Sequence, residues 1–216
     1  MWDIAILAIT LPFALIVSFL YYDKLRPVQL RIIVWAMILW LIVEVIGHIY
    51  SEVAKKSNHF IYNLYILPQY LPYFYIFYSS FVSPQLKKIT IYTGIAFIFI
   101  YIYYIFILNH FYHYGNFINN LGQLLTLALC FLYMAELLMQ ATFINYFEIP
   151  LFWIATGLIF YCTGNFVYNC MLGYILKNNL DPQGNVYMVI TSVTTNVQFG
   201  LFTIGLLCNK PWIKVK

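Results

Sequence analysis

Charged side chains are rare in this sequence, which has 11 Lys and Arg and 7 Asp and Glu among 216 residues, or 8%. A soluble domain carries roughly 25% charged residues. Apolar residues account for 63% of the chain and aromatic residues for 21%, with a mean hydropathy of +0.81. This composition excludes the soluble class and predicts an all-α, polytopic protein embedded in a lipid bilayer. The net charge of +4 therefore does not indicate a nucleic-acid partner.

Catalytic and cofactor motifs are missing as well. The chain has no GxSxG, no HExxH, no Walker loop and no dinucleotide fingerprint. The last apolar run contains no lysine before Lys210, which argues against a retinal Schiff base at the usual position. We therefore predict neither catalytic residues nor a cofactor, and a membrane-embedded enzyme is only the third alternative.

Residues that bind metals or form disulfides are few and poorly spaced. The four cysteines lie within apolar runs and have no CxxC spacing, so we expect them to be small core residues. His110 and His113 form an HxxH pair in a loop, which suits either a divalent ion or a pH sensor. This spacing is too weak a signal for a metal site to be predicted.

Short polar breaks separate seven apolar runs along the chain. We predict that these runs form one domain of seven transmembrane helices over 1–216. The first run has no basic region before it and no small-residue cleavage site, so it is expected to be a true span. The predicted spans are 2–22, 28–52, 59–82, 89–108, 120–142, 150–172 and 186–208.

The distribution of Lys and Arg predicts the orientation of these spans. With the N-terminus outside and the C-terminus inside, eight basic residues face the cytoplasm and three face outward. The eight are Lys24, Arg26, Arg31, Lys87, Lys88, Lys210, Lys214 and Lys216, and the three are Lys55, Lys56 and Lys177. The positive-inside rule favours this arrangement.

Two ionisable residues stand out within the second apolar run, which is long enough to cross a bilayer. Glu44 and His48 are four residues apart, so a helix projects both from one face. Because an ionisable group at membrane depth is costly, it is a candidate for a functional site by default. The alternative is a buried hydrogen bond that only fixes the packing of the helices.

Other polar side chains fall at a depth similar to that of Glu44 when the spans are aligned. With Glu44 and His48, the predicted ligand-binding residues are Gln69, Asn165, Asn169, Thr195 and Gln198. We expect the Asn165 amide to donate to Glu44 and to accept from His48. The alternative is hydrogen bonding between helices, which Ser, Thr, Asn and Gln commonly provide in membranes.

Several short segments resemble a group of small bacterial inner-membrane proteins with seven helices. They are Leu11–Phe13, Glu44, Pro150–Tyr161 with the following Gly164 and Asn165, and Thr194–Gly200. The resemblance covers the whole chain loosely. It implies location in the bacterial inner (cytoplasmic) membrane and association with signalling partners.

The function that these patterns favour is that of a non-enzymatic sensor or receptor-like protein. An outward-facing polar pocket would bind a small or amphiphilic ligand, and a membrane or cytoplasmic signalling partner would supply the output. The alternative is a transporter of small solutes, ions or protons. Three-helix repeats would then make Gly47 and His48 equivalent to Gly164 and Asn165.

The orientation leads to a direct test with reporter fusions. A reporter that is active only in the cytoplasm should work when it is fused after Lys216 and should fail when it is inserted in the loop at 109–119. A periplasmic C-terminus would invert the predicted topology and place Glu44 nearer the cytoplasm.

Overall fold

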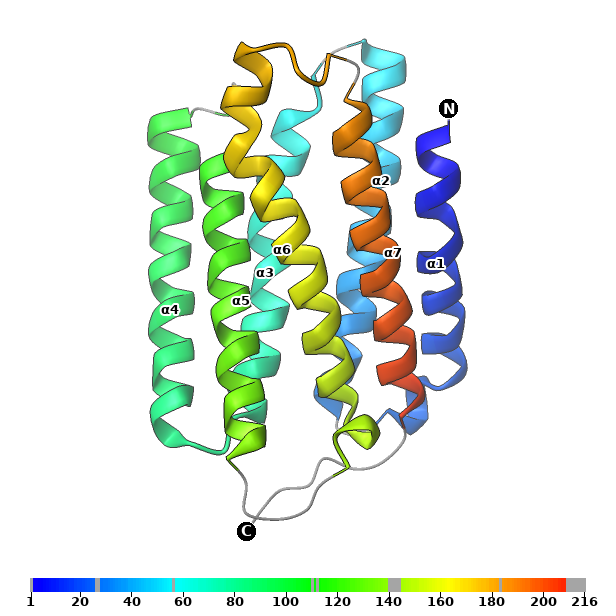
Figure 1. Cartoon of the computed structure of the whole chain (residues 1–216), viewed down its shortest axis with the longest axis vertical. Coiled ribbons are helices and arrows are strands. Elements are labelled where there is room, and N and C mark those ends of the chain that lie inside the picture. Colours follow the sequence, from blue (N-terminus) through cyan, green and yellow to red (C-terminus); the bar gives the residue numbers. More distant parts are fainter. Residues whose placement is uncertain are drawn as a thin grey trace. The chain divides into compact units, whose positions relative to one another are not determined.

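The computed structural model describes residues 2–25, 28–55, 57–109, 111, 113–139, 145–182 and 184–208. Within these ranges the chain forms seven α-helices (Figure 1), which confirms the predicted all-α class. They are α1 (Trp2–Leu20), α2 (Arg31–Ala54), α3 (His59–Ser80), α4 (Pro84–Ile102), α5 (Asn116–Leu138), α6 (Pro150–Lys177) and α7 (Asn185–Leu207). Arg26, Lys56, His110, Lys210, Lys214 and Lys216, which enter the predictions above, lie outside the described residues.

The helix ends differ from the predicted spans mainly at α4, α5 and α6. Helix α6 continues to Lys177, so the prediction that the sixth span ends at 172 was wrong. Helix α4 begins at Pro84, because proline suits the first turn of a helix, and continues after Ile102 as a π-helix, Tyr103–Asn109. Helix α5 begins at Asn116, so the prediction that 116–119 belongs to a loop was wrong. Asparagine is tolerated in a first helical turn, where backbone N–H groups still need partners.

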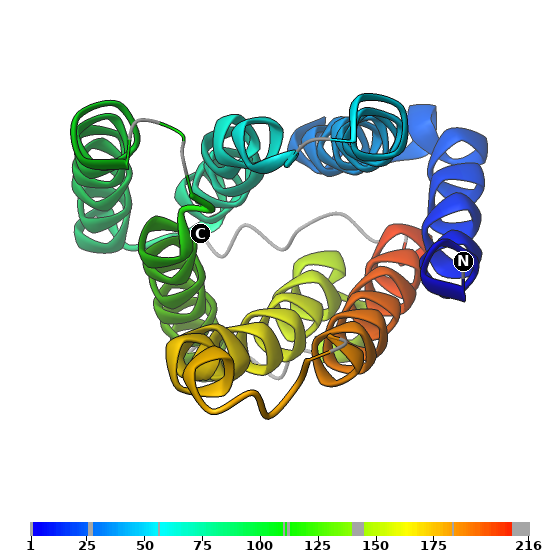
Figure 2. The same ribbon diagram turned by 90° about the horizontal axis from the view of Figure 1, so that it is seen from above.

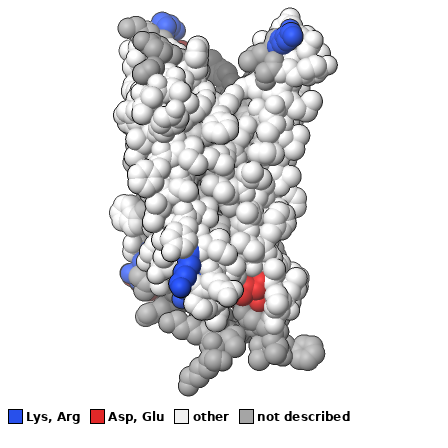
Figure 3. Space-filling model, turned by 90° about the vertical axis from the view of Figure 1, so that its left-hand side faces the viewer, with Lys and Arg blue, Asp and Glu red and all other residues white. Residues whose placement is uncertain are grey.

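Five helical segments are long and apolar enough to cross a membrane, which suggests an integral membrane protein. They are Arg31–Ala54, Pro84–Asn109, Asn116–Leu138, Pro150–Leu172 and Asn185–Leu207. Large apolar side chains are exposed along them, including Trp35, Phe99 and Phe131. On the face seen in Figure 3, charged side chains lie only towards the helix ends.

The chain divides into two compact units, Met1–Leu30 with Cys130–Lys216, and Arg31–Leu129. In the first unit α7 lies between α1 and α6 (Figure 2), and α1 and α7 run in the same direction (Figure 1). In the second unit α3 lies between α2 and α4. The division between the units falls within α5.

Glycines allow α6 and α7 to approach closely. A Cβ atom on Gly205 would lie 2.7 Å from the backbone oxygen of Pro150, and one on Gly164 would lie 2.4 Å from the Thr194 methyl carbon. Small residues give membrane helices this close backbone approach, which gains dispersion energy where no hydrophobic effect operates between helices. The α6–α7 pair is therefore the tightly packed part of its unit.

Aromatic side chains form the core of the second unit. The rings of Tyr70 and Phe74 in α3 each meet Phe97 of α4 edge to face, with centroids 5.7 Å apart in both pairs. Edge-to-face contact places a positive ring edge against a negative ring face. Tyr70 also lies against α5, where a Cβ atom on Gly122 would be 2.4 Å from its ring.

Alanine substitution of two glycines in α7 tests the packing of α6 on α7. Gly205→Ala should lower stability by about 1–3 kcal/mol, because a backbone atom cannot move aside as a flexible side chain can. Gly200→Ala is the matched control, since a Cβ atom there meets nothing within 4 Å. Thermal unfolding of the purified protein measures both, and equal melting temperatures would contradict the close approach.

Candidate functional site

The Glu44 carboxylate of α2 is half-buried and accepts one hydrogen bond. Its donor is the hydroxyl of Tyr62 in α3, with 3.1 Å between Tyr62 Oη and Glu44 Oε2. Gly47 makes room for this phenol, because a Cβ atom at position 47 would lie 3.0 Å from the Tyr62 hydroxyl. Glu44, Gly47 and Tyr62 therefore form one local arrangement between two successive helices.

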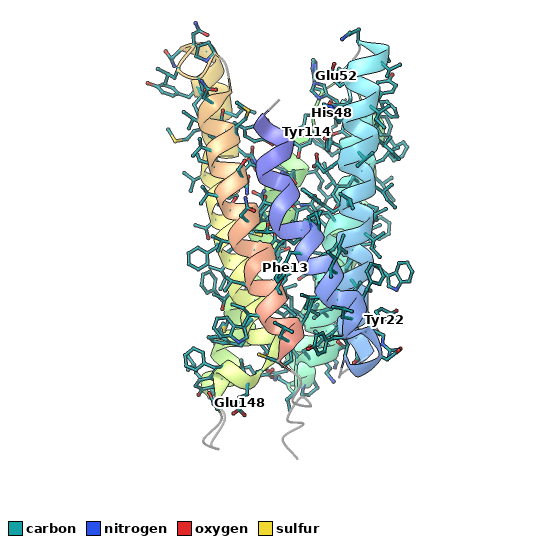
Figure 4. All side chains as sticks on the ribbon, turned by 90° about the vertical axis from the view of Figure 1, so that its right-hand side faces the viewer. Phe13, Tyr22, His48, Glu52, Tyr114 and Glu148 are labelled. Carbon is teal, nitrogen blue, oxygen red and sulfur yellow. The ribbon has the colours of Figure 1, made fainter. Side chains whose placement is uncertain are left out.

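His48 lies next to this arrangement but is exposed, near the same end of α2 as Glu52 (Figure 4). It has no hydrogen bond or ion pair within the described part of the chain. The nearby Asn58 donates its amide N–H to the Gly47 carbonyl over 3.2 Å, and Lys55 pairs with Glu52 over 3.6 Å. The C-terminal half of α2 thus provides an exposed imidazole one turn from a half-buried carboxylate.

The Asn165 amide of α6 has its partners within the first unit. Its Nδ2 donates to the Tyr161 carbonyl and to Thr194 Oγ1, both over 2.9 Å, and its Oδ1 accepts from Thr191 Oγ1 over 3.1 Å. Both amide protons are therefore used. The predicted hydrogen bond from this amide to Glu44 was wrong, because the threonines of α7 and a backbone carbonyl of α6 satisfy it.

The other predicted residues of the first unit are also turned towards protein. Thr195 and Gln198 of α7 are 2% and 4% exposed, and Asn169 of α6 is half-buried. Another hydrogen bond in this unit joins α1 to α7, from Thr10 Oγ1 to Asn196 Oδ1 over 2.6 Å. Asn165, Thr191, Thr194 and Asn196 thus bond between helices, the alternative raised by the sequence, whereas the hydroxyls of Thr156 and Thr203 donate to backbone carbonyls of their own helices.

In the second unit, Asn63 of α3 is completely buried and holds the loop between α4 and α5. Its Nδ2 donates to the His113 carbonyl and its Oδ1 accepts from the Gly115 N–H, both over 2.8 Å. Tyr101 of α4 donates its hydroxyl to the Asn63 carbonyl over 3.0 Å. Gln69, the residue predicted from this helix, is half-buried.

Buried polar residues on α5 were not among the predicted site residues. Asn119, Gln123 and Thr126 are 5%, 1% and 0% exposed. Gln123 and Thr126 fall inside the predicted span 120–142, but Asn119 was assigned to a loop. The spacing of the three residues, four and then three apart, places them on one helical face, but only if the helix includes Asn119. The predicted span began at 120, whereas α5 begins at Asn116.

A carboxylate caps the start of α7, outside the apolar segments. Asp181 accepts from the backbone N–H groups of Val186 over 3.2 Å and Tyr187 over 3.1 Å, and from the Tyr168 hydroxyl over 3.1 Å. Desolvation is the largest single influence and opposes ionisation, but these donors together outweigh it and lower the pKa of Asp181. Asp181 thereby ties α6 to α7.

No group of three or more His, Cys, Asp and Glu side chains in the described ranges is arranged to hold a metal ion. His113 is exposed, and its HxxH partner His110 lies outside those ranges. Cys130 and Cys162 are buried free thiols of the first unit, as predicted. Cys170 is exposed and Cys208 is half-buried, so the prediction that all four cysteines are core residues was wrong for these two.

Comparison with known proteins returned no matching family model, curated protein or solved structure. The resemblance to small seven-helix proteins of bacterial inner membranes therefore remains a prediction.

The Asp181 cap predicts a specific dependence of stability on pH. Because the folded-state pKa of this carboxyl is lowered, its stabilisation is present above its unfolded pKa of about 3.9 and is lost as the pH falls through the lower folded value. Thermal unfolding between pH 7 and pH 2 should show this loss in the wild type. Asp181→Asn should have a shallower acid limb, and Tyr168→Phe an intermediate one. Identical acid limbs for the wild type and Asp181→Asn would contradict the cap.

Proposed function

We propose that this chain is a non-enzymatic, receptor-like membrane protein whose Glu44 region binds a small or amphiphilic ligand carrying a positive charge. It would cross the bacterial inner membrane seven times, with its N-terminus outside. Five apolar helical segments support the membrane location. Helices α1 and α3, with 19 and 22 residues, are long enough to complete the set of spans.

The observation that carries the proposal is the incomplete satisfaction of Glu44. Its one partner in the described part of the chain is the neutral Tyr62 hydroxyl, and no cation there pairs with it. An ionised carboxylate at membrane depth is costly unless a positive group compensates it. An ammonium head group provides both the charge and the hydrogen-bond donors. The exposed His48 lies one turn away, on the side from which such a ligand would enter.

Transport is the second candidate, and one pair of observations favours it. Gly47 of α2 packs against Tyr62 of α3, and Gly164 of α6 packs against Thr194 of α7, so each glycine faces the next helix. Equivalent positions of this kind are expected in internal repeats.

The composition of the compact units favours the receptor over the transporter. Three-helix repeats would group α1 with α2 and α3, whereas α1 belongs with α6 and α7. A receptor without an output domain requires a partner, so we propose that a membrane or cytoplasmic signalling protein reads the ligand-bound state.

A pair of eight-carbon ligands with opposite charges tests the proposal. Octylamine should raise the melting temperature of the detergent-purified protein, and octanoate should not. Glu44→Gln should weaken the octylamine effect about tenfold or more in half-maximal concentration, since a hydrogen bond to a charged group contributes about 1.5–3 kcal/mol. Tyr62→Phe should change it less.

Glu52→Gln is the control, because Glu52 is an exposed carboxylate on the same helix. Equal responses of Glu44→Gln and Glu52→Gln would remove Glu44 from the site. Octylamine uptake into proteoliposomes that is saturable, driven by a gradient and lost in Glu44→Gln would establish the transporter instead.

A further inference from the structure

A buried polar stripe on α5 has no part in the Glu44 site. Asn119, Gln123 and Thr126 recur every three or four residues, so they share one face of the helix. Their side chains are 5%, 1% and 0% exposed. All three belong to the unit Arg31–Leu129, and the segment Asn116–Leu138 is apolar enough to cross a membrane.

Tyr70 of α3 satisfies the first member of this stripe. Its hydroxyl donates to Asn119 Oδ1 over 2.7 Å, and its ring lies against the backbone at Gly122. A structural explanation is therefore complete for Asn119, which fastens α3 to α5.

The next two members lack such partners. Gln123 Oε1 and Thr126 Oγ1 are buried, and neither has a hydrogen-bond partner within the described ranges. Buried polar atoms in native proteins almost always have one. In the interior of an apolar span, where hydrocarbon offers no hydrogen bond, an unsatisfied amide oxygen and an unsatisfied hydroxyl one turn apart indicate a place for a guest molecule.

The chemistry of the two atoms defines the class of guest. An amide oxygen accepts hydrogen bonds, and a threonine hydroxyl both accepts and donates. Residues three apart on a helix lie about 5–6 Å from each other, so one hydroxyl group between them reaches both. Neither an acidic nor a basic side chain occurs on α5 before Glu136, which disfavours a head group of either charge at this depth.

We propose that Gln123 and Thr126 form a second binding site on α5, for the hydroxyl head of an uncharged amphiphile. Its alkyl part would lie among apolar side chains. The site is independent of Glu44, which requires a positive charge, so either site can fail without the other.

The first experiment uses a photoreactive octanol that carries a diazirine, with its methyl ether as the matched probe, on the full-length protein in lipid nanodiscs. The alcohol should label the peptide at 116–138 saturably, in competition with 1-octanol. The ether should label it much more weakly, because it cannot donate a hydrogen bond to Gln123 Oε1. Gln123→Leu and Thr126→Val should each raise the half-saturating concentration about fivefold, which corresponds to one lost hydrogen bond. Thr90→Val is the control, because the buried Thr90 hydroxyl already donates to the Leu86 carbonyl of its own helix.

The second measurement compares melting temperatures without ligand. Gln123→Leu and Thr126→Val should keep or raise the melting temperature, because each removes a buried polar atom that lacks a partner. Asn119→Leu should lower it, because the Tyr70 hydroxyl loses its acceptor.

Three results would overturn the site. Equal labelling by alcohol and ether, or none, would mean that water or a rotated side chain satisfies these atoms. A Gln123→Leu protein that is as unstable as Asn119→Leu, or that does not fold, would show that Gln123 is a structural partner. Normal half-saturation in both α5 variants would place the alcohol elsewhere.

Discussion

The absence of water around a membrane helix is the constraint on which the polar interior of this protein depends. Each buried donor and acceptor must find its partner within the chain, because hydrocarbon offers none. The Asn63 amide meets this requirement with two backbone groups of the loop between α4 and α5, one carbonyl and one N–H. Asn165 meets it with three partners on α6 and α7. These amides hold neighbouring elements together.

Glu44 differs from these amides in both charge and satisfaction. A carboxylate has about four acceptor positions, and the Tyr62 hydroxyl occupies one of them. An amide in the same place would provide interhelical bonding without the cost of a charge. Unused acceptor capacity at Glu44, and at Gln123 and Thr126, supports the proposed binding positions, in contrast to the satisfied amides of Asn63 and Asn165.

The seven helices were predictable from the sequence because the signals for them are local. An apolar run of sufficient length between polar breaks needs a helix to satisfy its backbone, whatever its neighbours are. The start of α5 was misjudged because Asn116–Asn120 is asparagine-rich and resembles a loop. In the structure this stretch is helical, Asn119 accepts a hydrogen bond from the Tyr70 hydroxyl of α3, and Gly122 leaves room for the Tyr70 ring.

The membership of the polar site was less predictable, because the spacing of residues shows which of them share a face but not which helix that face meets. Glu44 and His48 do lie one turn apart on α2, as the spacing requires. Asn165 was assigned to Glu44 by depth alone, whereas its two amide protons are taken by Tyr161 and Thr194. Composition and apolar length therefore determined the helices, and side-chain packing in three dimensions decided the hydrogen-bond partners, since each donor proton can serve only the acceptor that the fold brings within about 3 Å.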